Sequence, residues 1–243
     1  MGAASEQLDA AARGFKATKI RGGDSPERDA HRYFVAREAL PASAGLAIDV
    51  VQGSNPDPWP AEIAIAMGRE IEQFDPLWLE EPCAANDHAG YARCRRELTV
   101  PIAGGETATT LDEFQRFFDH DALDIAQPDT AHAGGILAVR VIAAAAERAG
   151  VRIAVHSWLG AGSVMANYHT GFASPNCDWL EFPIQPNPFV MEMLAEPLTL
   201  DDGLVRPPTL PGLGIVLPDD LGDRYPYQAG CHYHFGARGE EVR

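Results

Sequence analysis

Residues 77–106 read LWLEEPCAANDHAGYARCRRELTVPIAGGE and contain two short apolar runs, each followed closely by an acidic side chain. The runs, Leu77–Glu80 and Pro101–Gly104, have the length and composition of buried β-strands. The segment between them shows helix-like spacing. A strand, a helix and a second strand in this order predict a βαβ unit with parallel strands.

The same alternation continues on both sides of this stretch. The other strand candidates are Thr18–Arg21, Leu46–Val51, Leu123–Ala126, Arg152–Val155 and Asp178–Glu181, and the clearest helical patterns are Ala61–Phe74, Asp112–Phe118 and Ile136–Ala149. Repeated βα units predict an α/β fold, a (β/α) barrel of the TIM type. Because we find about seven strands where eight would close the barrel, we expect it to be incomplete.

The pattern changes after Glu181, where the chain becomes rich in Pro and Gly, as in QPNPF, RPPTLPGLG and LPDDLGD. Too little apolar periodicity remains there to build a second domain. We therefore expect residues 1–182 to form the partial barrel. Residues 183–243 should add a last helix around Phe189–Ala195 and a Pro/Gly-rich tail of the same domain.

Composition excludes several classes of function. The 243 residues include 35 acidic and 19 basic ones, a formal net charge of −16, which disfavours binding to nucleic acid. No apolar run of about 18 residues is present, so we expect no membrane partner. The four cysteines, at positions 83, 94, 177 and 231, form no CxxC pair. This argues against a zinc ribbon or a disulfide scaffold and predicts a cytoplasmic protein.

Ionisable side chains recur at the predicted strand ends: Lys19 with Arg21, Asp49, Glu80, Glu106, Asp129, His156 and Glu181. Taking one per strand, the gaps are 30, 31, 26, 23, 27 and 25 residues, one βα unit each time. The C-terminal strand ends of a β/α barrel surround one mouth, where active sites are built. Strand-end acids can also cap the following helices, but seven successive units favour a site.

Asp49, Glu80 and Glu106 offer three carboxylates from consecutive strands. Oxygen ligands without Cys or His suit Mg²⁺. Their surroundings, IDVV, WLEEP and GGET, resemble the enolase superfamily in order and spacing. His156, Asp129 and the segment from Lys19 to Arg21 narrow this resemblance to the mandelate racemase-like subgroup, over about residues 14–218.

The resemblance implies a modified barrel in which Asp49, Glu80 and Glu106 bind one Mg²⁺ and a base removes the proton α to a substrate carboxylate. The resulting enediolate carries two negative charges, which a divalent cation stabilises. Glu81 should point to the other face of its strand and be structural.

His156 in AVHSW is the expected general base, with Asp129 in QPDT orienting its ring and favouring its charged form. Glu181 resembles the acid that hydrogen-bonds the substrate carboxylate opposite the metal. For that role we expect burial at the barrel mouth to raise its pKa.

Lys19 and Arg21 stand where the subgroup commonly carries Lys-x-Lys, on one strand face. Arginine is a poor base. We expect Arg21 to lower the pKa of Lys19 and to be able to bind a carboxylate with two hydrogen bonds. Racemisation needs a proton acceptor on each face of the substrate, so this pair favours dehydration of an acid sugar with His156 alone. If Lys19 serves as a second base, a racemase or epimerase of a 2-hydroxy acid is the alternative.

The sequence departs from the subgroup at two further places. The first is Val51, where relatives usually have Asn, and this weakens the inference of a metal site without removing it.

The second is the start of the chain. Relatives carry an N-terminal capping domain and a first barrel strand before the segment that begins this sequence. We expect a fragment of a longer protein, weakly active alone, and the alternative is an inactive truncated barrel. A homo-oligomer is expected of the full-length protein, and the acid sugar cannot be named. His132, His169, His232 and His234 receive no role.

Overall fold

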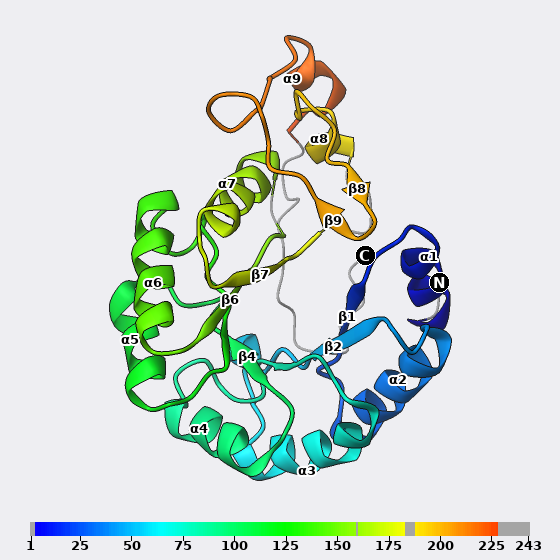
Figure 1. Cartoon of the computed structure of the whole chain (residues 1–243), viewed down its shortest axis with the longest axis vertical. Coiled ribbons are helices and arrows are strands. Elements are labelled where there is room, and N and C mark those ends of the chain that lie inside the picture. The colour runs from blue at the N-terminus through cyan, green and yellow to red at the C-terminus, as the bar shows by residue number, and fades with distance from the viewer. Residues whose placement is uncertain (1–2, 159, 183–187, 228–243) are drawn as a thin grey trace.

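The computed structural model describes residues 3–158, 160–182 and 188–227. Its main sheet has seven parallel strands in chain order. They are β1 (Ala17–Arg21), β2 (Gly45–Asp49), β3 (Leu79–Glu80), β4 (Ile102–Gly104), β5 (Ile125–Ala126), β6 (Arg152–Val155) and β7 (Cys177–Leu180). The sheet curls around a central axis (Figure 1). The predicted incomplete β/α barrel is therefore confirmed.

Helices cover the outer face of this sheet (Figure 1). They are α1 (Ala3–Ala12), α2 (Pro26–Ala39), α3 (Ala61–Ile71), α4 (His88–Glu97), α5 (Leu111–Asp119), α6 (Ile136–Arg148) and α7 (Ala161–Phe172), with 3₁₀ turns η1 (Gln52–Ser54) and η2 (Glu72–Phe74). Local signals set their starts. In α5, for example, Thr110 and Glu113 form a reciprocal capping box. None of the described helices is long and apolar enough to cross a bilayer.

The core has an outer and an inner part. The outer part fills the space between sheet and helices and includes Ile48, Ile102, Phe114 and Ile142. The inner part lies inside the curled sheet, where alanines of β2, β4 and β6 leave room for two indole rings. These rings, Trp78 and Trp179, meet edge to face with centroids 6.4 Å apart.

Side chains connect the two edge strands of the sheet, β1 and β7, which pair with no described strand on their outer sides. Phe15 and Phe182, which flank these strands, pack with ring centroids 5.4 Å apart. Lys19 Nζ lies 3.0 Å from Glu181 Oε1. We call this contact region, formed by Phe15, Lys19, Glu181 and Phe182, the seam.

The segment after β7 packs on α7. It contains α8 (Pro188–Met191), the hairpin of β8 (Leu200–Asp201) and β9 (Leu204–Val205), and α9 (Leu221–Arg224). The helix predicted to run to Ala195 ends at Met191 instead, because the chain next forms a bridge from Leu194 to Ile215. Assignment of 183–243 to the barrel domain stays a prediction, and Cys231, His232 and His234 lie outside the described residues.

Candidate active site

Three carboxylates converge at the C-terminal ends of β2, β3 and β4. Asp49 and Glu80 end their strands and are buried, and Glu106 follows β4. One carboxylate oxygen from each lies within 4.8 Å of the other two. Burial, followed by the charge of Glu80, raises the pKa of Asp49 to about 7. An all-oxygen donor set with so much negative charge fits a Mg²⁺ ion.

Glu80 is held from three sides. Its Oε2 accepts hydrogen bonds from Trp78 Nε1 at 2.8 Å and from Gln127 Nε2 at 2.7 Å. Its Oε1 accepts one from Lys19 Nζ at 2.6 Å. The predictions did not include Trp78 or Gln127. The available signal was that Trp78 shares a strand face with Glu80 and that Gln127 opens the QPD motif.

Lys19 lies between Glu80 and Glu181, and this overturns one expectation. Burial alone would lower the pKa of Lys19, but the charges of Glu181 and Glu80 bring it well above its ordinary value. The predicted lowering by Arg21 is therefore wrong, because the nearby acids outweigh that cation. Arg21 lies exposed at the end of β1, and its guanidinium forms no ion pair with any acid in the described part of the chain.

His156 and Asp129 form a hydrogen-bonded pair, as the sequence predicts. His156 Nδ1 lies 2.8 Å from Asp129 Oδ2, and His156 Nε2 lies 3.4 Å from Glu106 Oε2. Burial alone would lower the pKa of His156, but the hydrogen bond to Asp129 and the charges of Glu181 and Glu106 raise it. The imidazole therefore faces the acidic cluster with Nε2 and is oriented from behind through Nδ1.

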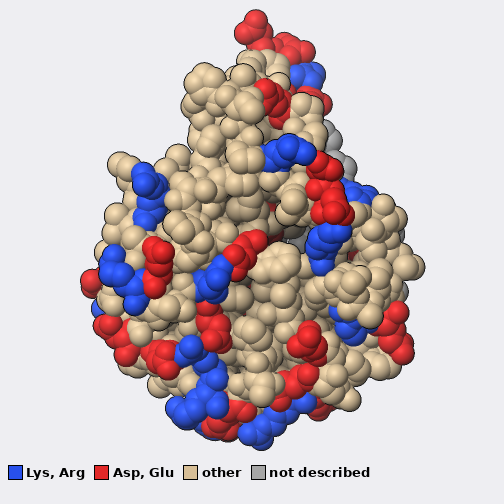
Figure 2. Space-filling model, viewed as in Figure 1, with Lys and Arg blue, Asp and Glu red and all other residues tan. Residues whose placement is uncertain are grey.

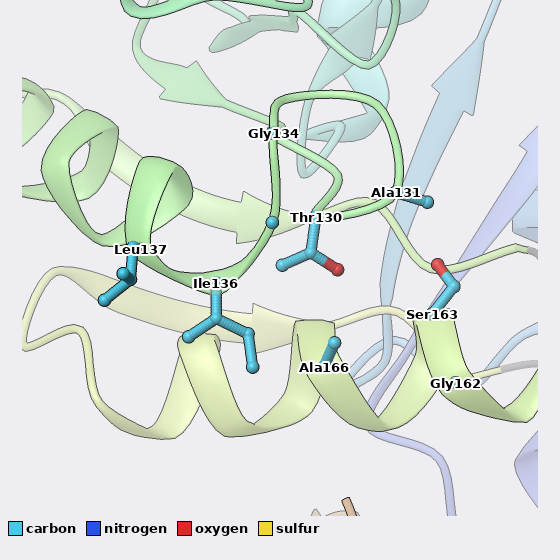
Figure 3. A pocket seen from close by; sticks show the side chains of 9 residues that line it. Thr130, Ala131, Gly134, Ile136, Leu137, Gly162, Ser163 and Ala166 are labelled. Atoms are coloured by element: carbon cyan, nitrogen blue, oxygen red, sulfur yellow. The ribbon is translucent and has the colours of Figure 1, made fainter.

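Asp129 is fixed by α7 as well as by His156. Its Oδ1 accepts hydrogen bonds from Asn167 Nδ2 at 3.0 Å, Ser163 Oγ at 3.2 Å and the Ala131 N–H at 2.7 Å. Burial would raise the pKa of Asp129, but the hydrogen bonds from His156, Asn167 and the Ala131 N–H lower it to about 2. Figure 3 shows the loop after β5 and the start of α7 side by side, lining a shallow pocket. The sequence offered no signal for Asn167.

Glu181 corrects a second expectation, because its pKa is lowered and not raised. Burial acts in the expected direction, but the charges of Lys19 and His156 and the N–H of Ser157 stabilise the carboxylate. The Ser157 N–H donates to Glu181 Oε2 at 2.8 Å. Glu181 is therefore an ionised partner of Lys19, not a neutral acid.

Two further residues lie close to this site. The exposed His132 ring stacks on His156 with centroids 6.3 Å apart, and its Nδ1 donates to the Glu106 carbonyl at 3.0 Å. Glu81 is buried with a left-handed backbone and lies against Gly53. Neither of its carboxyl oxygens bonds to a described residue, and its pKa is raised to about 9, mainly by burial.

Comparison with known proteins identifies the family of this chain. The model of the enolase C-terminal domain-like family matches residues 3–221. D-galactarolactone cycloisomerase from Agrobacterium fabrum is 34% identical over 226 residues, which cover 89% of this chain and 58% of that relative. Arabinonate dehydratase from Saccharolobus solfataricus is 32% identical over 213 residues, which cover 87% of this chain and 56% of that relative.

Comparison with solved structures also finds dehydratases of this kind. L-Talarate dehydratase from Polaromonas sp., complexed with Mg and L-glucarate, matches with a TM-score of 0.79 at 29% identity. This match covers 92% of the chain described above and 60% of the dehydratase. The chain thus spans less than two thirds of the length of each of these three relatives.

Proposed function

Because the chain belongs to the enolase C-terminal domain-like family, among the mandelate racemase-like members of the enolase superfamily, we propose that it catalyses dehydration of an acid sugar. The reaction would begin with Mg²⁺-dependent removal of the proton α to the carboxylate. The observation that carries this proposal is the position of His156 Nε2, 3.4 Å from Glu106 Oε2 at the edge of the acidic cluster. This position would let the proposed base and the proposed metal site act on one substrate.

The chain's own residues supply the proton transfer. Asp129 accepts a hydrogen bond from the Nδ1–H of His156, which leaves Nε2 as the basic atom of the neutral ring. Nε2 takes the α-proton, and the C–H electron pair moves into the enediolate. The pair then expels the β-hydroxyl group, which leaves as water after receiving the proton from His156. The remaining enol becomes a 2-keto-3-deoxy acid.

Asp49, Glu80 and Glu106 would hold the ion. When bound, Mg²⁺ would supply positive charge beside the substrate carboxylate as the enediolate forms. Lys19 is held as a cation between two carboxylates, which makes it a poor proton acceptor. This disfavours a two-base racemase or epimerase, although the relatives include a cycloisomerase.

The test is incubation of the purified chain with Mg²⁺ and a panel of aldonates and aldarates in D₂O, followed by NMR. We expect a 2-keto-3-deoxy acid from at least one substrate. His156→Gln should lower this rate by about 10²- to 10⁴-fold, while His120→Gln, which alters a histidine at the end of α5, should leave it unchanged.

Rapid α-deuteration with inversion and no keto acid would favour an epimerase instead. Mg²⁺ binding without any reaction would support the view that this stretch alone is inactive. No Mg²⁺ binding at all would contradict the metal site itself.

A further inference from the structure

The two oxygens of Glu80 have different surroundings. Oε2 accepts two N–H donors, Trp78 Nε1 at 2.8 Å and Gln127 Nε2 at 2.7 Å, so both of its lone pairs are used. Among the described residues, Oε1 accepts a hydrogen bond from Lys19 Nζ alone, at 2.6 Å. Oε1 is therefore the oxygen with a lone pair left for a cation.

The two donors lie in the packed interior of the fold. Trp78 fills the inside of the curled sheet, and Gln127 follows β5 with its own N–H bonded to the Gly104 carbonyl. Both side chains are almost fully buried. Trp78 is enclosed by Ala47, Ala103, Ile125 and Ala154, with Leu77 and Trp179 packed beside them. A carboxylate gripped in this way cannot rotate to offer both oxygens to an ion.

We propose that Trp78 and Gln127 are positioning residues that fix Glu80 as a one-oxygen ligand through Oε1 and thereby set the affinity of the site for Mg²⁺. The inference rests on the proposed function, because it requires that the acidic cluster binds the ion. Partners that hydrogen-bond ligating carboxylates commonly change metal affinity by about 10- to 100-fold when they are removed.

The experiment is calorimetric titration of Mg²⁺ into the purified chain and four variants, without substrate. Trp78→Phe removes one donor with little change in shape, and Gln127→Met removes the other. Trp179→Phe is the matched control, because it lies in the same cluster and its indole N–H bonds to no described residue. Gln7→Met is the second control, a buried glutamine that bonds Thr18 instead of a site carboxylate.

We expect the Kd for Mg²⁺ to rise by about 10- to 100-fold in Trp78→Phe and in Gln127→Met and to stay within about threefold of the parent in both controls. Circular dichroism checks that each variant is folded, and if one donor variant does not fold, the other decides. Unchanged affinity in a folded donor variant would overturn this inference and leave the proposed function standing. Equal weakening in the controls would also overturn it. A parent chain that binds no Mg²⁺ would overturn both.

Discussion

At the scale of single residues, two buried aspartates at the barrel mouth have opposite pKa shifts. Burial raises the pKa of Asp49 to about 7, and the charge of Glu80 adds to it. Asp129 is equally buried, yet donors from His156, Asn167 and Ala131 lower its pKa to about 2. Asp129 is therefore ionised at every working pH and can orient His156 by a hydrogen bond. Asp49 instead belongs to a group of close carboxylates that a bound cation would stabilise.

Asp129→Asn tests the first of these roles. The raised pKa of His156 means that Nε2 becomes protonated, and unable to act as a base, as pH falls through a value above its ordinary 6.5. Removing the negative partner lowers this pKa, so the acidic limb of α-proton exchange should move to lower pH. The plateau rate should fall by about 10²-fold or more. NMR exchange rates across a pH series measure both.

Asp124→Asn is the control for this prediction, because Asp124 precedes β5 at the opposite end of the strand and bonds Arg95 and the Ile102 N–H. Its pH profile should match the parent. A parent-like acidic limb in Asp129→Asn would contradict the assignment of Asp129 as the partner that raises the pKa of His156.

Val51 is a residue under backbone strain. Its φ is +54°, in the left-handed region, because the chain turns so that the Val51 N–H donates to Asp49 Oδ1 at 2.8 Å. A β-branched side chain is poorly suited to this region, whereas Asn tolerates it. Val51→Asn should raise the free energy of unfolding by about 1 kcal/mol, as measured by urea denaturation. Val216→Asn, at an exposed position without positive φ, should give no such gain.

At the scale of elements, α7 both covers the sheet and completes the site. Ser163 and Asn167 are four residues apart, so they share a helix face, and both reach Asp129 Oδ1. Asn167 Oδ1 also accepts the Thr130 N–H at 2.8 Å, which ties the loop after β5 to the helix. A side-chain amide carries both the donor and the acceptor that these two bonds require.

Asn167→Ala should lower both the stability and the rate of α-proton exchange, because Asp129 loses a donor and its loop loses an anchor. We expect about 1–3 kcal/mol less unfolding free energy. Asn176→Ala is the matched control, since its side chain bonds the carbonyls of Ala143 and Val151. It should destabilise by a similar amount without lowering the rate per folded molecule. Equal rate losses in both variants would show that Asn167 acts through stability alone.

The predicted elements succeed where apolar residues recur with a clear period. All seven strands were predicted, though β3 and β5 are only two residues long, because their pairing stops at the loops that carry the site. The helix expected over Ala61–Phe74 ends at Ile71, since the chain tightens into η2 before the left-handed Asp75. Neither α2 nor α4 gave one of the clearest helical patterns, because both are rich in charged residues.

The residues of the candidate site that lie at strand ends could be predicted from the sequence. The pKa shifts could not, because they depend on side chains that other strands bring close. Asp49, Glu80, Glu106, Asp129 and His156 were found from their positions at predicted strand ends and from the family resemblance, and the structure brings them together. The catalytic and metal-binding roles assigned to them stay predictions. The directions of the pKa shifts at Lys19 and Glu181 were wrong, because each is set by a partner from the other edge of the sheet.

At the scale of the whole molecule, charges of both signs are mixed on the face seen in Figure 2, while acidic side chains gather inside. Figure 2 shows acidic and basic side chains interleaved over the visible face. Inside the sheet, the acidic side chains of Asp49, Glu80 and Glu106 lie close together. Cytoplasmic location and homo-oligomer formation stay predictions.

Mg²⁺ should therefore stabilise the whole fold. At about 100 times its Kd, a ligand that binds only the folded state adds about 2.7 kcal/mol to the unfolding free energy. Glu106→Gln should lose most of this increase, yet be more stable than the parent without Mg²⁺, because one of three crowded charges is gone. Thermal denaturation of the parent and of Glu106→Gln, each with and without Mg²⁺, measures both differences in stability. Glu147→Gln, on the exposed end of α6, should behave like the parent.

The seam joins the two edges of the sheet by a cation, an anion and two aromatic rings, without a backbone ladder between β1 and β7. Lys19 and Glu181 thus connect the two edges of the sheet and also belong to the candidate active site. A change that neutralises either side chain should lower both the stability of the fold and the rate of the proposed reaction. Architecture and reactivity cannot be adjusted independently at this one place.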